Sequence, residues 1–226
     1  MTEQNYFQCA LNNEQYRELK NELYAYMEKN FSDQVKFSCC RIHPIITLTA
    51  DEKKIVKKAV AKRCYEFSAG RRCARKCLAH SGISDFSLLK GEYGEPVWPQ
   101  GFTGAITHNS GVAFAVTVPQ NHGLIGIDFV DLSEKLPSSH LILDLKELET
   151  KFADNLQNPE LLLFSLKESV IKILSPSLQK YIEFTDIKII SGNGVTEITY
   201  REKKMGINLY WYIYSNYAFT VAVKNI

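Results

Sequence analysis

The amino-acid sequence predicts an α+β fold, because helical and strand patterns occupy separate blocks of the chain. Helical periodicity covers residues 49–80, strand-like runs follow from Thr103, helical patterns return from residue 141 and include Lys172, and further strands follow. A regular alternation of strand and helix would instead indicate a parallel sheet. At 226 residues and 45% hydrophobic content, the chain can build a packed core in one domain or in two small ones.

The first helical pattern begins near Thr49, with acidic residues in its first turn. Apolar residues then recur at helical spacing as far as Phe67. Gly70 is a point where this helix can break or bend, and a second helical stretch over 71–80 either follows it or continues it.

Short apolar or alternating runs at 104–107, 112–118 and 124–130 predict antiparallel strands with a hairpin. The turn residues at 119–123 precede the last of these runs, and Asp128 is expected to close a strand.

Two helices are expected next, one over 141–152 and one capped by Asn158 with Pro159 at its first position. The second helix carries Glu168 and Lys172 one turn apart on the same face. Four more strands are predicted at 186–191, 195–200, 207–214 and 217–223, the first two joined by a turn at 192–194.

Composition excludes several classes of protein. With 27 basic and 25 acidic residues the net charge is +2, so no global field favours nucleic acid or a membrane surface. No run approaches the roughly 18 apolar residues of a membrane span, and the N-terminus lacks a basic region followed by an apolar one, which predicts a cytoplasmic protein.

Six cysteines are present, but their pattern favours reduced, buried thiols over a secreted disulfide framework. Cys39 and Cys40 are adjacent, and Cys73 and Cys77 lie within a helical pattern. Cys73, Cys77 and His80 could ligate zinc, yet no second ligand pair stands at a finger-like spacing, so zinc is the lesser alternative.

Two acids and a lysine are the candidate chemical groups. Asp128 and Glu168 offer hard oxygen ligands for Mg²⁺, and Lys172 can neutralise a departing phosphate, which together suit a magnesium-bound diphosphate. The alternative is that Glu168 and Lys172 form only a solvated helix pair worth a few tenths of a kcal/mol.

Five segments occur in an order that resembles the 4'-phosphopantetheinyl transferases of the large, monomeric type, the enterobactin-synthase branch in particular. The resemblance runs in motif from Arg63 to Lys172 and more loosely to the C-terminus. Its segments are Arg63-x-x-x-Phe67-x-x-x-Arg71-x-x-x-Arg75, Gly94-Glu95-Pro96-x-Trp98-Pro99, Thr107-His108, Gly126-Ile127-Asp128 and Lys167-Glu168-Ser169-x-x-Lys172.

The resemblance implies two similar subdomains in a pseudo-twofold arrangement, residues 1–120 and 121–226, each a small antiparallel sheet with a long helix. The active site would lie in the cleft between them. It implies a monomer that moves 4'-phosphopantetheine from coenzyme A to a serine of an apo acyl, peptidyl or aryl carrier protein, for siderophore or other nonribosomal peptide synthesis.

The resemblance also implies roles for residues. Asp128 and Glu168 would bind Mg²⁺, Glu168 or a metal-held water would take the serine proton, and Lys172 would stabilise the leaving phosphate. The N-terminal half would contact the nucleotide end of coenzyme A, with arginine suited to bidentate phosphate binding. The coenzyme A contacts would be Arg63, Arg71, Lys90, Thr107, His108 and Lys172.

One position departs from the family pattern. Many relatives carry a further acidic metal ligand two residues after the first aspartate, where this chain has Val130. Side chains two apart on a strand share a face, so Val130 is expected on the metal-facing side, Asp131 on the other, and a water in the vacant coordination position.

Two other functions compete with this interpretation. The basic stretch 53–76 could serve a nucleic-acid-binding module, although such a charge run is usually the solvated side of a helix. A hydrolase with a Cys or Ser nucleophile ranks last, because the chain has no Gly-x-Ser-x-Gly elbow.

Overall fold

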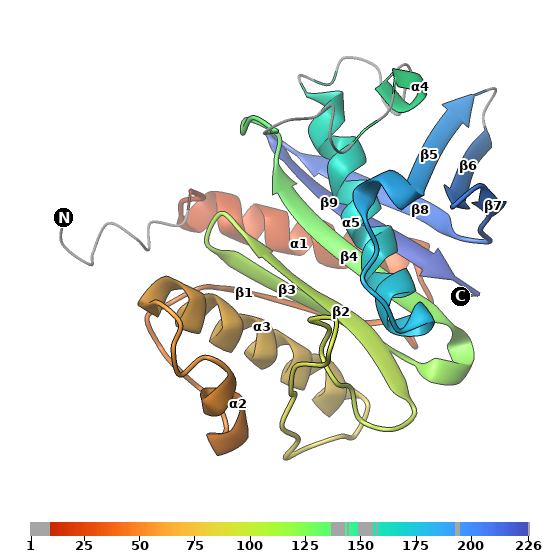
Figure 1. Ribbon diagram of the computed structural model, residues 1–226. Coiled ribbons are helices and arrows are strands. Elements are labelled where there is room, and N and C mark those ends of the chain that lie inside the picture. The colour runs from red at the N-terminus through yellow and green to blue at the C-terminus, as the bar shows by residue number, and fades with distance from the viewer. Residues whose placement is uncertain are drawn as a thin grey trace. The chain divides into compact units, whose positions relative to one another are not determined.

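The computed structural model describes residues 10–136, 143, 145–148, 156, 158–192 and 195–225. The chain divides into two compact units, residues 1–123 and 124–226, here called the N-terminal and C-terminal units (Figure 1). Each unit combines helices with small antiparallel sheets, so the predicted α+β class is confirmed.

The N-terminal unit is built on an antiparallel sheet of order β1-β3-β2. The central strand is buried from Val112 to Val118, because helices cover the sheet. Its elements are α1 (Asn13–Asn30), β1 (Lys36–Arg41), α2 (Ala50–Ile55), α3 (Ala61–His80), β2 (Phe102–Asn109), β3 (Val112–Pro119) and the short helix η2 (Gln120–His122).

The two faces of this sheet differ in side-chain size. The α3 face is lined by small residues, among them Cys40, Ala113 and Ala115, which pack against Ala69 and Cys73 of α3. Small side chains let the helix approach the strands closely. The opposite face carries aromatic residues: the ring of Phe37 stacks on that of Phe114 and makes an edge contact with Tyr24 of α1.

The first helical prediction needs correction. The pattern from Thr49 breaks after one and a half turns: Thr49 and Glu52 form a capping box that starts α2, and α2 ends at Ile55. Gly70 does not break the next helix, which runs unbroken from Ala61 to His80. A Cβ on Gly70 would lie 2.7 Å from the Ile106 side chain, so glycine lets β2 approach α3.

The C-terminal unit contains a sheet of order β4-β9-β8 and a second, smaller sheet of order β5-β6-β7. Helix α5 packs on β4 and β9, and its apolar face shares one hydrophobic cluster with both sheets. Its elements are β4 (Leu124–Asp131), α4 (Leu145–Leu148), α5 (Pro159–Leu178), the short helix η4 (Phe184–Asp186), β5 (Ile187–Gly192), β6 (Val195–Tyr200), β7 (Lys203–Lys204), β8 (Asn208–Tyr214) and β9 (Tyr217–Lys224).

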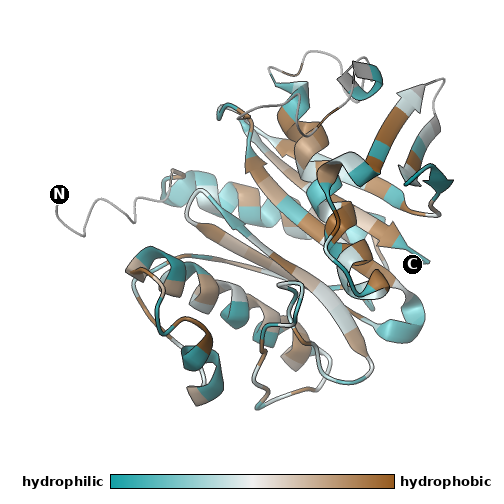
Figure 2. Cartoon of the chain, in the orientation of Figure 1, coloured by the Kyte–Doolittle hydropathy of each residue, from teal (hydrophilic) through white to brown (hydrophobic). Residues whose placement is uncertain are grey.

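Hydropathy follows this packing. Figure 2 shows brown residues along the strands and α5, whereas α1 is mostly teal. Helix α1 buries only Leu19, Leu23 and Met27, one residue per turn, so a narrow apolar stripe suffices to hold it.

The predicted strands are present within one or two residues of their expected bounds. The hairpin joins β2 to β3, whereas β4 pairs with the distant β9, with Asp128 opposite Thr220. Asp128 therefore lies inside its strand, which continues to Asp131. Helix α1 and strands β1 and β7 were not predicted, and parts of the expected helix 141–152 and turn 192–194 lie outside the described residues.

No helix in the described part of the chain is long and apolar enough to cross a membrane.

Candidate functional site

Asp128 is held at both carboxylate oxygens by helix α5. The Lys172 Nζ lies 2.9 Å from Asp128 Oδ1 and also donates to the backbone carbonyl of Ile127 at 2.8 Å. The Ser165 hydroxyl donates to Oδ2 at 2.8 Å. Gly126 makes this approach possible, because a Cβ there would lie 2.0 Å from the backbone oxygen of Ser169. The carboxylate is thus fixed in direction before any ligand binds.

A buried hydroxyl cluster supports this arrangement. The Thr220 hydroxyl lies 2.9 Å from that of Ser165 and 2.8 Å from that of Ser169, and it can donate to the Ser165 carbonyl at 3.0 Å. All three side chains are buried. No role was predicted for these three residues from the sequence. The available signal was a serine pair at i and i+4 on the otherwise apolar face of the predicted helix.

Glu168 lies on α5 one turn before Lys172, as predicted, and is half-buried. Burial raises the pKa of its carboxyl, the charge of Asp128 raises it further, and Lys172 opposes both effects. A carboxyl with a raised pKa is a stronger base once it is deprotonated. The two carboxylates are near enough for their charges to interact, and such oxygen donors suit a hard divalent cation.

The other lysine of the motif does not reach these groups. Lys167 is fully buried, with its Nζ 2.7 Å from Glu147 Oε2 and 3.1 Å from the Phe184 carbonyl. The second oxygen of Glu147 accepts the backbone N–H of Ile189 at 2.8 Å. This buried ion pair joins α4, α5 and β5, so Lys167 is a structural residue.

Val130 lies in the hydrophobic cluster of this unit, 5% exposed. Strand alternation places it on the same face as Gly126 and Asp128. Asp131 accepts hydrogen bonds from the backbone and hydroxyl of Ser133 and is partly exposed. No three His, Cys, Asp or Glu side chains converge as a metal site within the described ranges.

The N-terminal unit holds a second polar group. The Arg63 Nη1 donates to His108 Nε2 at 2.8 Å, and Glu66 lies 3.9 Å from both side chains. Arg63 is half exposed, whereas the neighbouring Thr107 is buried. Arg63 and His108 come from α3 and β2, which pack together, so the structure brings together two of the predicted coenzyme A contacts. Thr107 lies opposite Phe114, on the face of the sheet away from α3, so its side chain does not join this group.

Lys90 is exposed at the start of a tight turn that carries the Gly94-Glu95-Pro96 motif. Lys90 and Pro96 form an isolated β-bridge, and Gly91 N–H donates to the Glu95 carbonyl at 2.7 Å. Gly94 has φ of +92°, a backbone conformation that favours glycine.

Arg71 is only 5% exposed, and its donors bind the protein itself. Its Nε donates to the Leu88 carbonyl at 2.8 Å and one Nη to the Leu89 carbonyl at 3.3 Å, while the guanidinium covers the Phe67 ring at 4.0 Å. Arg71 thus fixes the segment that leads into Lys90.

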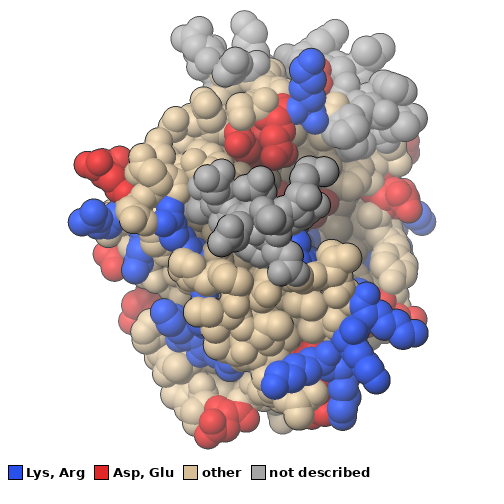
Figure 3. Space-filling model, turned by 90° about the vertical axis from the view of Figure 1, so that its left-hand side faces the viewer, with Lys and Arg blue, Asp and Glu red and all other residues tan. Residues whose placement is uncertain are grey.

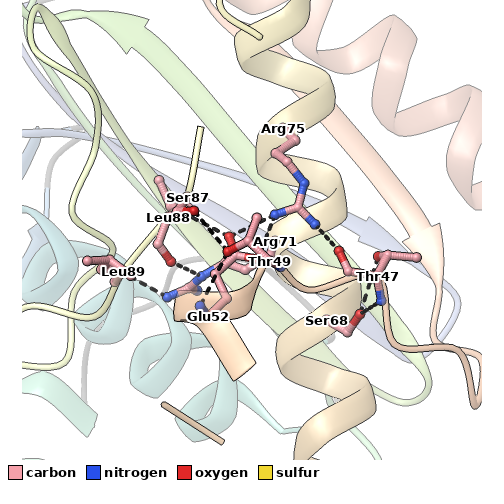
Figure 4. Close-up of polar contacts among 9 residues, drawn as sticks. All are labelled: Thr47, Thr49, Glu52, Ser68, Arg71, Arg75, Ser87, Leu88 and Leu89. Atoms are coloured by element: carbon pink, nitrogen blue, oxygen red, sulfur yellow. Dashed lines mark hydrogen bonds and ion pairs between the residues drawn. The ribbon is translucent and has the colours of Figure 1, made fainter. Parts of the chain in front are cut away.

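A buried carboxylate lies beside Arg71 (Figure 4). Glu52 is fully buried, accepts two bonds from Arg75 at 2.7 and 2.9 Å, and accepts the backbone N–H groups of Thr49 and Leu88. From the sequence, Glu52 was predicted only as one of the acidic residues in the first turn of a helix. Arg75, the last arginine of the motif that begins at Arg63, is therefore a structural residue that pairs with the buried Glu52.

Most of the remaining basic stretch is solvent-exposed, including Lys53, Lys57 and Lys58. Figure 3 shows Lys and Arg side chains gathered toward the lower right of one face, with acids also scattered over that face. The zinc alternative is not supported: the Cys73 and Cys77 thiols are fully buried and donate to backbone carbonyls, whereas His80 is exposed.

Two family descriptions match the chain. The "4'-phosphopantetheinyl transferase N-terminal domain" matches residues 51–118, and the "4'-phosphopantetheinyl transferase superfamily" matches residues 124–222. The second match includes Asp128, Glu168 and Lys172.

Individual relatives are similar over about two thirds of the chain. The 4'-phosphopantetheinyl transferase PptT of Mycobacterium tuberculosis is 32% identical, over 65% of this chain and 66% of its own length. The 4'-phosphopantetheinyl transferase Npt of Nocardia iowensis is 33% identical, over 63% of this chain and 70% of its own length. Enterobactin synthase component D of Salmonella typhi is 31% identical, over 62% of this chain and 61% of its own length. The chain thus spans about two thirds of the length of these relatives. The crystal structure of Thermotoga maritima holo-[acyl-carrier-protein] synthase matches with a TM-score of 0.34 and 24% identity, over 45% of this chain and 62% of its own.

Proposed function

Because the chain belongs to the 4'-phosphopantetheinyl transferase family, on the branch that includes enterobactin synthase component D, we propose that it transfers 4'-phosphopantetheine from coenzyme A to a serine of an apo carrier protein. The observation that carries the proposal is the pairing of Asp128 and Lys172, with Glu168 one helical turn away. The substrates would be acyl, peptidyl or aryl carrier domains, and siderophore synthesis is the pathway class that the enterobactin relatives suggest.

Glu168 is the proposed base. Its pKa is raised by burial and by Asp128, which suits a group that must take a proton from a serine hydroxyl. Lys172 is the proposed stabiliser of the leaving phosphate. Its ammonium has three donors, of which one binds the Ile127 carbonyl and one binds Asp128, so a third can reach a phosphate oxygen.

We propose that Asp128 and Glu168 would also hold Mg²⁺. The donor set fits a hard cation, because two carboxylates whose charges interact are relieved by a divalent ion, and Mg²⁺ completes its shell with phosphate oxygens and water. When bound, the ion would neutralise charge on the diphosphate. Val130 offers no ligand atom, so two protein carboxylates are the proposed set.

The nucleotide end of coenzyme A would bind in the N-terminal unit. Support comes from Arg63 and His108, which are already paired at 2.8 Å and carry donors suited to phosphate oxygens. Lys90, which is exposed, would add an ammonium. Arg71 would contribute through the Leu88–Leu89 segment that it holds, in addition to any direct contact. The monomeric state and cytoplasmic location stay predictions.

The test is carrier modification read by intact mass. The protein is incubated with coenzyme A, Mg²⁺ and a panel of apo carrier proteins, and a phosphopantetheine adduct on at least one carrier is the expected result. A panel in which no carrier gains mass would contradict the proposal.

Matched lysine variants sharpen this test. Lys172→Met should abolish the adduct, because it removes the proposed phosphate contact, whereas Lys203→Met should not, because Lys203 is an exposed residue of β7. Equal loss in both variants would point to a general effect of charge and not to the proposed site.

A further inference from the structure

Two cysteine sulfurs meet where helix α3 packs on strand β1. Cys73 Sγ lies 3.2 Å from Cys40 Sγ, and the Cys73 thiol can also donate to the backbone carbonyl of Ala113 at 3.4 Å. Cys73 is fully buried and Cys40 is 9% exposed. A disulfide has an S–S length of about 2.05 Å, so the sulfurs need to approach by only about 1.2 Å to bond.

A cation stabilises one of the two thiols. The Arg72 Nη2 donates to Cys40 Sγ at 3.1 Å and to the Arg41 carbonyl at 2.9 Å. The hydrogen bond from Cys73 and the bond from Arg72 lower the pKa of Cys40, against the effect of burial, and the same thiol–thiol bond raises the pKa of Cys73. Cys40 is thus the nucleophile of the pair, because the thiolate is the reactive form.

The other described cysteines lack this arrangement. Cys77, one turn after Cys73 on α3, donates to the Ala115 carbonyl at 3.4 Å, and burial raises the pKa of its thiol. Burial also raises the pKa of Cys39, to about 12. Cys64 is half-buried and faces the carbonyls of Val56 and Ala59. Within the described residues, only Cys40 has both a sulfur neighbour and a guanidinium donor.

We propose that Cys40 and Cys73 form a redox-sensitive thiol pair that a hydroperoxide converts into an intramolecular disulfide. In the first step, the Cys40 thiolate attacks the peroxide oxygen, the O–O bond breaks, and Cys40 becomes a sulfenic acid while hydroxide leaves. In the second, the Cys73 sulfur attacks the Cys40 sulfur, the S–O bond breaks, and the Cys73 proton leaves with the hydroxide as water. Two thiols and one hydrogen peroxide give one disulfide and two waters.

A small oxidant fits the site, because Cys40 is almost buried. The cross-link would tie β1 to α3, the helix that carries Arg63 and Arg71. The proposal does not depend on the transferase function, since it concerns the thiols of the N-terminal unit alone.

The experiment treats the full chain, in a Cys9→Ser/Cys64→Ser background, with hydrogen peroxide and then blocks the remaining thiols. Intact mass should show the loss of two hydrogen atoms, and a non-reducing peptide map should join the peptides of Cys40 and Cys73. Dithiothreitol should reverse both changes. A map that joins other cysteines, or oxygen addition without a cross-link, would overturn the proposal.

Cys73→Ser should abolish the cross-link and leave Cys40 to accumulate as sulfenic acid, trapped by dimedone. Cys77→Ser is the matched control, because Cys77 makes the same kind of carbonyl contact without a sulfur neighbour, and it should form the cross-link as the parent does. Circular dichroism melting checks that each variant is folded. Equal cross-linking in Cys73→Ser would refute the pairing.

Discussion

Replacing Lys167 by Met should destabilise the C-terminal unit strongly. Lys167 and Glu147 are almost completely buried, with side-chain exposures of 0% and 1%, and their charged atoms are 2.7 Å apart. Met fills the space of the lysine stem but removes the cation that lies 2.7 Å from the buried Glu147 carboxylate. Breaking a buried pair from one side costs about 3–5 kcal/mol. Since whole domains are stable by roughly 5–15 kcal/mol, the loss is large.

A double variant separates the ion pair from simple packing. Glu147→Gln removes the carboxylate charge but keeps a carbonyl oxygen for Ile189, so Lys167→Met/Glu147→Gln leaves no buried charge. The double variant should therefore recover a large part of the lost stability, and the double-mutant cycle should give a coupling of about 2 kcal/mol or more. Additive losses would show that the two charges do not interact.

The assay is urea unfolding followed by tryptophan fluorescence. The chain has two tryptophans, Trp98 in the N-terminal unit and Trp211 in the C-terminal unit, so a Trp98→Phe background reports on the unit that holds Lys167. Lys204→Met is the matched control, since the side chains of Lys204 and Glu197 are 69% and 49% exposed and an exposed pair is worth at most about 1 kcal/mol. A Lys167→Met midpoint close to that of the parent would refute the reasoning.

Three further predictions concern residues of the candidate site and of the N-terminal unit. The pKa of Glu168 is raised, so native stability should fall as pH rises from the ordinary glutamate pKa through the raised one, and Glu168→Gln should remove this step in urea midpoints measured against pH. Arg63→Ala should weaken coenzyme A binding in calorimetry without changing stability, whereas Arg71→Ala should also lower the melting temperature, because Arg71 is buried and binds two carbonyls. Gly126→Ala should lose about 1–3 kcal/mol and carrier modification, because its Cβ would overlap the α5 backbone, whereas Gly206→Ala, which meets nothing within 4 Å, should change little in either assay.

Local signals in the sequence predicted the helix and strands that carry the candidate site. Asn158 and Pro159 mark the start of α5 correctly, although the Asn158 side chain donates to the Glu134 carbonyl. The strand patterns were equally clear, because β-rich runs ended at turn residues. A comparable signal for α1 was present but unused: Asn12 and Gln15 form a capping box, and one apolar residue per turn follows.

Helix bounds, strand pairing and the burial of Arg71 depend on tertiary contacts, which local sequence patterns do not predict. The end of α2 at Ile55 and the continuity of α3 through Gly70 depend on packing, since glycine there serves the approach of β2. Pairing of β4 with β9 joins residues about 90 positions apart, which local periodicity cannot detect. The burial of Arg71 against Leu88 and Leu89 was hidden for the same reason, so its motif position alone suggested an exposed phosphate contact.

Helix geometry explains how one motif can serve both stability and the proposed chemistry. Residues five apart on an α-helix differ in direction by about 140°, so Lys167 and Lys172 cannot share a target. Ser165, at i−7 from Lys172, and Ser169, at i−3, lie on the Lys172 side and meet Asp128 and Thr220 there. Lys167 points instead to Glu147. Lys167 is thus a buried cation that fixes the surroundings of α5, whereas Lys172 is a partly exposed cation on the other side, where the proposed ligand would bind. A substitution of Lys167 therefore tests the stability of the unit, and a substitution of Lys172 tests the proposed function.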